Sequence, residues 1–184
     1  MNVQILIVPY DSGHFRSRMG RGPEHLLEHF LAPMLNRMGC HFRTEEITIS
    51  DKFPVEIKTS FTLSKLVAER VRACRRDGWF PVVLSGNCNV AVGTISGCGC
   101  GSTGVVWFDA HGEATTRETT TSGFLDGMGI SILTGQCWTT LATSISGFAA
   151  MAGERAVQVG SRDLEQSEFR IVRSTRSPAG RRQR

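Results

Sequence analysis

The sequence predicts an α/β fold in which a mostly parallel sheet lies between two layers of helices. Short apolar runs rich in β-branched residues recur along the chain, and segments with apolar residues at helical spacing separate them. Strands that alternate with helices are typical of parallel sheets, because parallel neighbours need a long crossover connection. The 184 residues are 40% hydrophobic and 21% charged, which is enough for one domain with a buried core.

Five segments have the character of strands. Residues 3–8 form a short apolar run, interrupted only by Gln4, which favours a strand that is buried on both faces. Residues 42–49 are a weaker candidate, because polar side chains interrupt the run. Three further runs are similar to the first, at residues 80–84, 104–108 and 156–160.

Amphipathic helices are expected between these runs. Pro23 and Glu24 suit a first helical turn, where a missing backbone N–H costs little and an acid faces the positive end of the helix. The helix then runs to Gly39, and its apolar residues are Leu26, Leu27, Phe30, Leu31, Met34, Leu35 and Met38. A second helix ends near Gly78, with apolar residues Leu63, Leu66, Val67, Val71 and Cys74, and residues 90–95 open a third.

The formal net charge of +4 arises from the last fifteen residues of the sequence. Residues 170–184 contain six arginines and no acid, and without them 15 basic residues face 17 acidic ones. We therefore expect a domain over residues 1–169 and a basic, disordered tail over 170–184. A solvated tail is the simpler reading, with a polyanion site as the alternative, and we expect no nucleic-acid partner.

The chain is expected to be cytoplasmic and not to enter a membrane. No apolar run approaches the ~20 residues that a membrane-spanning helix needs. The first residues lack the basic start and the cleavage site of a secretory signal. The six cysteines are accordingly expected to be reduced thiols.

Three polar clusters follow predicted strands, at residues 85–89, 109–113 and 161–165. Loops beyond the carboxyl ends of parallel strands are where the chemistry of such folds collects. The most specific cluster is Asp109-Ala110-His111-Gly112-Glu113. In extended backbone alternate side chains share one side, so two carboxylates and an imidazole would converge on a divalent ion. The alternative is a polar loop whose aspartate caps a helix.

Longer stretches around this cluster are similar to the arginase (ureohydrolase) family. Residues 105–113, followed by Thr119-Thr120-Thr121-Ser122-Gly123, resemble that family's metal motif and its substrate-holding segment. Residues 20–24 resemble an early Gly-Pro turn, residues 84–89 lie where the family has Gly-Gly-Asp-His-Ser, and residues 159–165 resemble an Ile-Gly-x-Arg-Asp stretch. The resemblance covers about residues 1–168.

The resemblance implies a three-layer α/β/α domain that hydrolyses a guanidino-type (linear amidine, non-peptide) carbon–nitrogen bond, as in arginine metabolism. It implies two Mn²⁺ ions bridged by a water, whose pKa the ions would lower. Asp109, His111 and Glu113 would be metal ligands. Thr115 and Ser122 would contact the amino-acid end of a small guanidino substrate, and Glu165 its amine. Each of these last three has an alternative as a loop hydrogen-bonding or capping residue.

Three substitutions depart from the family pattern. Cys88 stands where the family has a ligand histidine, and a thiolate favours Zn²⁺ or Fe²⁺ over Mn²⁺. An inert thiol is the alternative. Glu113 replaces an aspartate, which keeps the donor type but moves its oxygens. Asp126 replaces a histidine that is proposed to transfer protons, and an ionised aspartate cannot donate one at neutral pH.

The family also has a later strand with a Ser-x-Asp-x-Asp motif, which residues 114–184 lack. The resemblance therefore implies a domain that is truncated at its C-terminal side, with a metal site for one ion or none. Strands that should be interior would become sheet edges, so a homo-oligomer is expected. A catalytically inactive relic, or a metal-binding or interaction subunit, is the alternative to an enzyme.

Overall fold

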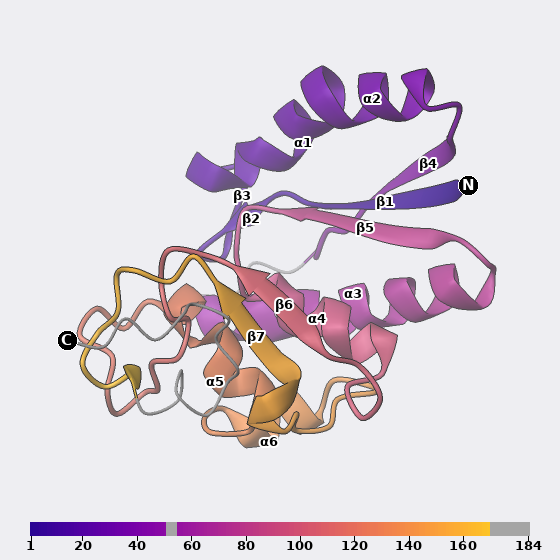
Figure 1. The fold of residues 1–184 in the computed structure, drawn as a ribbon. Coiled ribbons are helices and arrows are strands. Elements are labelled where there is room, and N and C mark those ends of the chain that lie inside the picture. The colour runs from indigo at the N-terminus through magenta and orange to yellow at the C-terminus, as the bar shows by residue number, and fades with distance from the viewer. Residues whose placement is uncertain (51–54, 170–184) are drawn as a thin grey trace.

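The computed structural model describes residues 1–50 and 55–169, and Figure 1 shows their arrangement. A three-stranded parallel sheet has the order β4 (His41–Glu46), β1 (Asn2–Val8), β5 (Phe80–Ser85). In its register Ile5 lies between Thr44 and Val82. The predicted α/β class with a parallel sheet is confirmed. The predicted tail over residues 170–184 lies outside the described residues.

The central strand β1 is buried on both faces because its side chains alternate between two helical layers. Val3, Ile5 and Ile7 pack with Leu35 of the layer formed by α1 (Gly22–Leu26), a π-helical turn (Leu27–Leu31) and α2 (Ala32–Arg37). Its other face packs with α3 (Glu56–Arg76), as Figure 1 shows. This double burial explains why apolar residues occupy both faces of the strand at residues 5–8.

The first helical segment buries less than its pattern predicts. Of its seven apolar residues only Leu35 is fully buried, while Leu26, Phe30, Met34 and Met38 are exposed. These four residues recur at intervals of four, so they lie along one outer face of the segment. The three-stranded sheet covers only one side of this layer, and the opposite face remains at the surface.

A second, two-stranded parallel sheet pairs β6 (Val105–Phe108) with β7 (Ala156–Val159). It packs with α4 (Val90–Cys98), α5 (Gly129–Leu133) and α6 (Thr139–Thr143) around the largest apolar cluster, which includes Trp107. Helix α4 also lies close against α3. A Cβ at Gly97 would lie 2.7 Å from the carbonyl oxygen of Ala68, so this contact needs glycine.

Short elements shape the carboxyl ends of β1 and β5. Strands β2 (Tyr10–Asp11) and β3 (His14–Phe15) form a small hairpin, followed by a 3₁₀ turn at Arg18–Arg21. Further 3₁₀ turns lie at Leu125–Met128 and Gly153–Arg155. A Cβ at Gly86 would lie 2.7 Å from the backbone N of Gly20. The glycine thus lets the loop after β5 approach the turn that follows β3.

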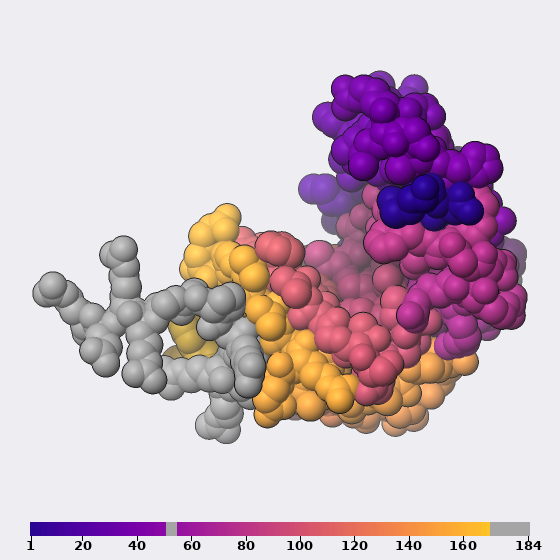
Figure 2. Space-filling model, turned by 45° about the vertical axis from the view of Figure 1, so that its right-hand side comes forward, coloured from indigo at the N-terminus to yellow at the C-terminus, as the bar shows by residue number. Residues whose placement is uncertain are grey.

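Strands β5 and β6 do not pair with each other in the described part of the chain. A cavity of about 520 Å³ separates them, with walls from both strands and a floor from α4. Figure 2 shows this hollow between the indigo-to-magenta and the orange-to-yellow parts of the molecule. The cavity reaches Cys88 at the end of β5 and Asp109 at the end of β6. No described helix is long and apolar enough to cross a membrane.

Candidate metal centre

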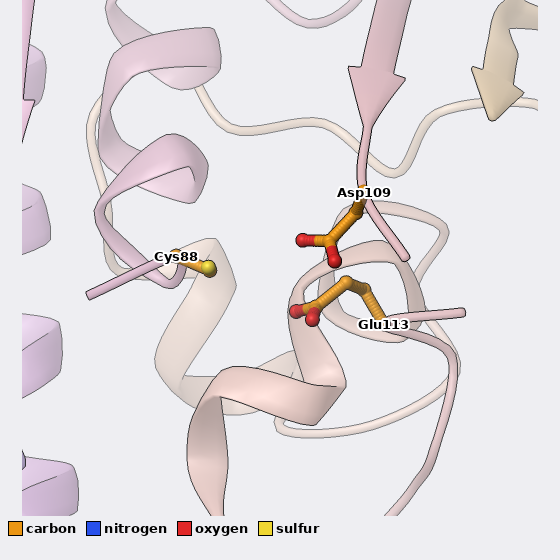
Figure 3. A group of neighbouring side chains, drawn as sticks. All are labelled: Cys88, Asp109 and Glu113. Atoms are coloured by element: carbon orange, nitrogen blue, oxygen red, sulfur yellow. The ribbon is translucent and has the colours of Figure 1, made fainter. Parts of the chain in front are cut away.

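Three side chains meet where β5 and β6 end. Cys88 lies in the loop after β5, Asp109 directly follows β6, and Glu113 lies four residues farther on. One ligand atom from each lies within 4.8 Å of the other two, and Figure 3 shows the two carboxylates side by side with the sulfur facing them. The structure thus brings together three of the four predicted ligands.

Glu113 is the most buried member of the group, with 4% of its surface exposed. Its Oε2 is buried and has no hydrogen-bond partner among the described residues. Its backbone has a left-handed φ of 53°, and its carbonyl oxygen accepts a hydrogen bond from the Ile130 N–H at 2.8 Å. Such a conformation is strained in a residue with a side chain, and it turns this carboxylate toward the group.

Asp109 is half-buried at the end of β6, and its N–H donates to the carbonyl oxygen of Val159 in the last residue of β7. Its Oδ1 accepts a hydrogen bond from the His111 N–H at 3.0 Å. The sheet therefore holds the backbone of Asp109, while the turn that follows holds one of its carboxylate oxygens.

The structure does not bring His111 into the group of three. Its side chain is 62% exposed, and its Nδ1 lies 3.1 Å from Asp109 Oδ1. The expected convergence of Asp109, His111 and Glu113 required extended backbone through the motif. Instead His111 forms an isolated bridge with Asp163, and the chain turns at Glu113. Because the backbone does not stay extended, the alternation of side chains is lost.

The group carries acids and no compensating base. Burial, followed by the charges of Asp109, Asp126 and Glu168, raises the pKa of the Glu113 carboxyl to about 8. Partial desolvation of the thiol, followed by the charges of Glu113, Asp126 and Asp109, raises the pKa of Cys88 to about 12, although the residue as a whole is exposed. Each shift reflects first the cost of placing a charge where little water reaches it, and then the repulsion from the neighbouring acids. A bound cation would remove that cost.

Asp126 holds the loop that carries Cys88. It is buried in the 3₁₀ turn Leu125–Met128, its Oδ2 accepts from Asn87 Nδ2 at 2.6 Å, and its Oδ1 accepts from the Asn89 N–H at 3.1 Å. Burial raises the pKa of Asp126, while these hydrogen bonds act in the opposite direction. Asn87 Oδ1 in turn accepts from the Ser12 N–H at 2.9 Å. A catalytic role for Asp126 stays a prediction, and the contacts describe a positioning residue.

The three predicted substrate contacts each have a partner within the chain. Thr115 is buried, and its hydroxyl donates to the Gly127 carbonyl oxygen at 2.7 Å. Ser122 is exposed, and its hydroxyl oxygen accepts from the Phe124 N–H at 3.2 Å. Glu165 is half-buried and accepts from the Thr121 hydroxyl at 3.1 Å. These contacts match the loop-stabilising alternative, so substrate contact by these residues stays a prediction.

The sequence reasoning missed Glu168. Its carboxylate is buried and accepts from the Ala114 N–H at 2.9 Å and from the Glu165 N–H at 2.7 Å. A Cβ at Gly112 would lie 2.6 Å from Glu168 Oε1, so the glycine makes room for it. Glu168 thereby fastens the loop after β7 to the loop after β6. A single glutamate without a motif carries no signal that could have shown this.

Comparison with known proteins agrees with this architecture. The sequence model of the arginase family matches residues 1–178. The arginase of Bacillus subtilis is 27% identical over 185 residues, which cover 94% of this chain and 62% of the relative. The arginase of Brevibacillus brevis is 31% identical, with 94% of this chain and 61% of the relative covered. The chain thus spans about three fifths of the length of these curated relatives.

Solved structures show the same fold. The crystal structure of Bacillus subtilis arginase has a TM-score of 0.84 at 25% identity, and the match covers 96% of this chain and 63% of that one. The agmatine ureohydrolase of Thermoplasma volcanium has a TM-score of 0.60 at 17% identity, covering 96% and 56%, which shows the shared fold alone. Because the family match extends over almost the whole sequence, the chain belongs to the arginase family.

Proposed function

We propose that this chain is part of a metal-dependent hydrolase that cleaves a guanidino-type carbon–nitrogen bond. Membership of the arginase family supports this proposal, and the names of the relatives, arginase and agmatine ureohydrolase, point to guanidino substrates. The single observation that carries the metal centre is the buried, unpartnered Oε2 of Glu113, which lies close to Asp109 and Cys88, two residues that line the cavity.

The residues of the site fit one divalent cation. Two octahedral ions such as Mn²⁺ need on the order of ten oxygen or nitrogen ligands between them. The described residues bring together two carboxylates and one sulfur, and they leave His111 outside. This donor set therefore fits a single ion with an open position. When bound, such an ion would lower the pKa of a water molecule and polarise the bond to be broken.

The chain's own residues would bind and orient the substrate. A guanidinium group carries positive charge, and Asp126, which is not among the proposed metal ligands, is the acid near the site that could attract it. Asp126 holds the loop with Cys88 in place through Asn87 and Asn89. Glu168 does the same for the loop that follows Asp109.

A non-catalytic metal-binding subunit is the second candidate function. It is favoured by the small donor set that the described residues bring together. Such a subunit would bind the cation without turnover, and other polypeptide would have to supply the remaining ligands. This candidate and the hydrolase differ only in turnover, so one assay separates them.

The test is urea release from L-arginine and from agmatine by the purified chain loaded in turn with Mn²⁺, Co²⁺ and Zn²⁺. The hydrolase proposal predicts release with at least one metal, and Asp109→Asn should abolish it. Asp77→Asn makes the same chemical change at an exposed acid just after α3 and should leave the rate unchanged. If a folded, metal-loaded chain releases no urea from either compound, the subunit is favoured and the hydrolase proposal fails.

A further inference from the structure

The composition of the donor group differs from that of a manganese site. Mn²⁺ and Mg²⁺ prefer carboxylate, carbonyl and water oxygens, while thiolates select Zn²⁺ and other softer ions. Here one of the three converging donors is a sulfur, and it comes from a different strand end than the two carboxylates. The sulfur therefore lies across the cavity from the acids, where it can close a coordination shell with them.

A second observation points to a ligand at the same place. Only 4% of the surface of Glu113 is exposed, and its Oε2 has no hydrogen-bond partner among the described residues. A buried carboxylate oxygen without a partner is costly, and natural structures retain one mainly where an ion, water or substrate completes it. Figure 3 shows this carboxylate directed into the group with Cys88 and Asp109.

The separations suit a tetrahedral ion. Zinc lies ~2.3 Å from a thiolate sulfur and ~2.0 Å from a carboxylate oxygen, so ligand atoms around it lie on the order of 3.3–3.8 Å apart. The three donor atoms lie within 4.8 Å of one another, so a shift of about an ångström brings them into place. Three protein ligands and one open position are the arrangement of a catalytic zinc site rather than a structural one.

We infer that this centre binds one thiolate-accepting divalent ion of the Zn²⁺, Fe²⁺ or Co²⁺ class, with Cys88 Sγ, Asp109 and Glu113 as ligands, in place of a manganese pair. The inference rests on the metal centre of the proposed function but not on turnover. It assigns Cys88 a role as a ligand, and it makes the open fourth position the place where water or substrate binds.

Cobalt titration of the metal-free full chain tests this assignment, because the absorption spectrum of bound Co²⁺ depends on which atoms bind it. A thiolate ligand produces a near-ultraviolet sulfur-to-cobalt charge-transfer band, which should saturate at one Co²⁺ per chain. Zn²⁺ should displace the cobalt and remove the band, whereas Mn²⁺ at the same concentration should not. Absence of the band in a chain that binds cobalt would overturn the assignment. Displacement of the bound cobalt by two equivalents of Mn²⁺ would overturn it as well.

Three variants sharpen the test. Cys88→Ser should abolish the band and weaken Zn²⁺ binding at least tenfold, while Cys40→Ser, at a half-buried cysteine before β4, should change neither. Cys88→His should bind metal without the band and should shift preference toward Mn²⁺, which keeps the test valid if the serine variant folds poorly. Equal Zn²⁺ affinity in Cys88→Ser and the unchanged chain would contradict the inference.

The outcomes separate this inference from the proposed function. If the band forms but no urea is released with any metal, the thiolate centre stands and the hydrolase proposal fails. If urea is released with Mn²⁺ and the band is absent, the hydrolase proposal stands and the thiolate centre fails.

Discussion

At the scale of the residue, Glu113 links the stability of the chain to its metal site. Its carboxyl has a pKa of about 8 in the folded chain against an ordinary value of 4.5. Between these two values the folded chain holds a proton that the unfolded chain has released, so stability falls as pH rises. Below about pH 4.5 the group is protonated in both states and its effect is absent.

Glu113→Gln should therefore stabilise the metal-free chain at pH 7 by roughly 1–3 kcal/mol, because the unfolded chain no longer gains free energy by ionising this side chain. Urea unfolding at pH 5, 7 and 8 measures this, and the difference from the unchanged chain should grow with pH. Burial raises the pKa of Asp126 and of Glu56 as well. Both acids are present in the variant and in the unchanged chain, so the comparison between the two reports on Glu113.

Glu154→Gln, at an exposed glutamate, provides the control and should give a pH-independent difference near zero. The same Glu113→Gln variant should lose metal binding, so stability and function change in opposite directions. A variant that is less stable than the unchanged chain at pH 8 would contradict this account of Glu113.

The predictable part of the site is the part that depends on strand ends. Cys88 and Asp109 could be placed near each other from the sequence because loops at the carboxyl ends of the strands of an α/β fold gather on one side, and this holds although β5 and β6 belong to separate sheets. The position of His111 could not be predicted. The direction of its side chain depends on a turn, and the packing of residues 109–113 against residues 161–168 determines that turn. Glu168 has no local pattern at all, and only its buried partners reveal its role.

At the scale of the element, the packing of α4 on α3 depends on glycine. A Cβ at Gly93 would overlap the carbonyl oxygen of Ser64, and one at Gly97 would overlap that of Ala68. Alanine normally stabilises a helix by about 1 kcal/mol relative to glycine, so helix propensity alone predicts that these substitutions help. The contact between the two helices predicts the opposite.

Gly93→Ala should lower the free energy of unfolding by about 2 kcal/mol or more, because α3 and α4 must separate to admit the methyl group. Gly101→Ala is the control, since a Cβ there meets no atom within 4 Å beyond its chain neighbours and Gly101 lies outside the contact between the two helices. Thermal melting followed by circular dichroism measures both. A Gly93→Ala chain that melts as high as Gly101→Ala would show that the helices do not pack this closely.

The helices were predictable in position but not in burial. Regular apolar spacing identified the segment from Pro23 to Gly39, yet the face with Phe30 and Met38 remains exposed. The spacing of apolar residues predicts that a helix has an apolar face. It does not predict whether other parts of the fold cover that face.

At the scale of the whole molecule, the sheet is divided into two parts with unpaired edges. Among residues 1–50 and 55–169, strands β5 and β6 have no partner on the sides that line the cavity, and Val106 and Phe108 of β6 are exposed. Unpaired edges with apolar side chains promote association with other chains. The division itself could not be read from the sequence, because five strand patterns do not say which strands pair.

We expect the purified chain to self-associate, and its apparent mass in gel filtration should rise with concentration. Val106→Lys should shift the equilibrium toward the monomer, because a charge on an edge strand opposes pairing. Phe30→Lys removes an exposed apolar side chain from the helical layer instead and should have a smaller effect. A monodisperse monomer that melts cooperatively at every concentration would contradict this expectation.

The central claim is that Cys88, Asp109 and Glu113 hold one metal ion between the ends of β5 and β6. X-ray absorption at the zinc edge of the zinc-loaded chain tests it most directly, because the fine structure reports the ligand atoms around the metal. The account predicts one sulfur at ~2.3 Å and oxygen ligands at ~2.0 Å, with the sulfur lost in Cys88→Ser. A shell of oxygen and nitrogen alone, unchanged in that variant, would contradict it.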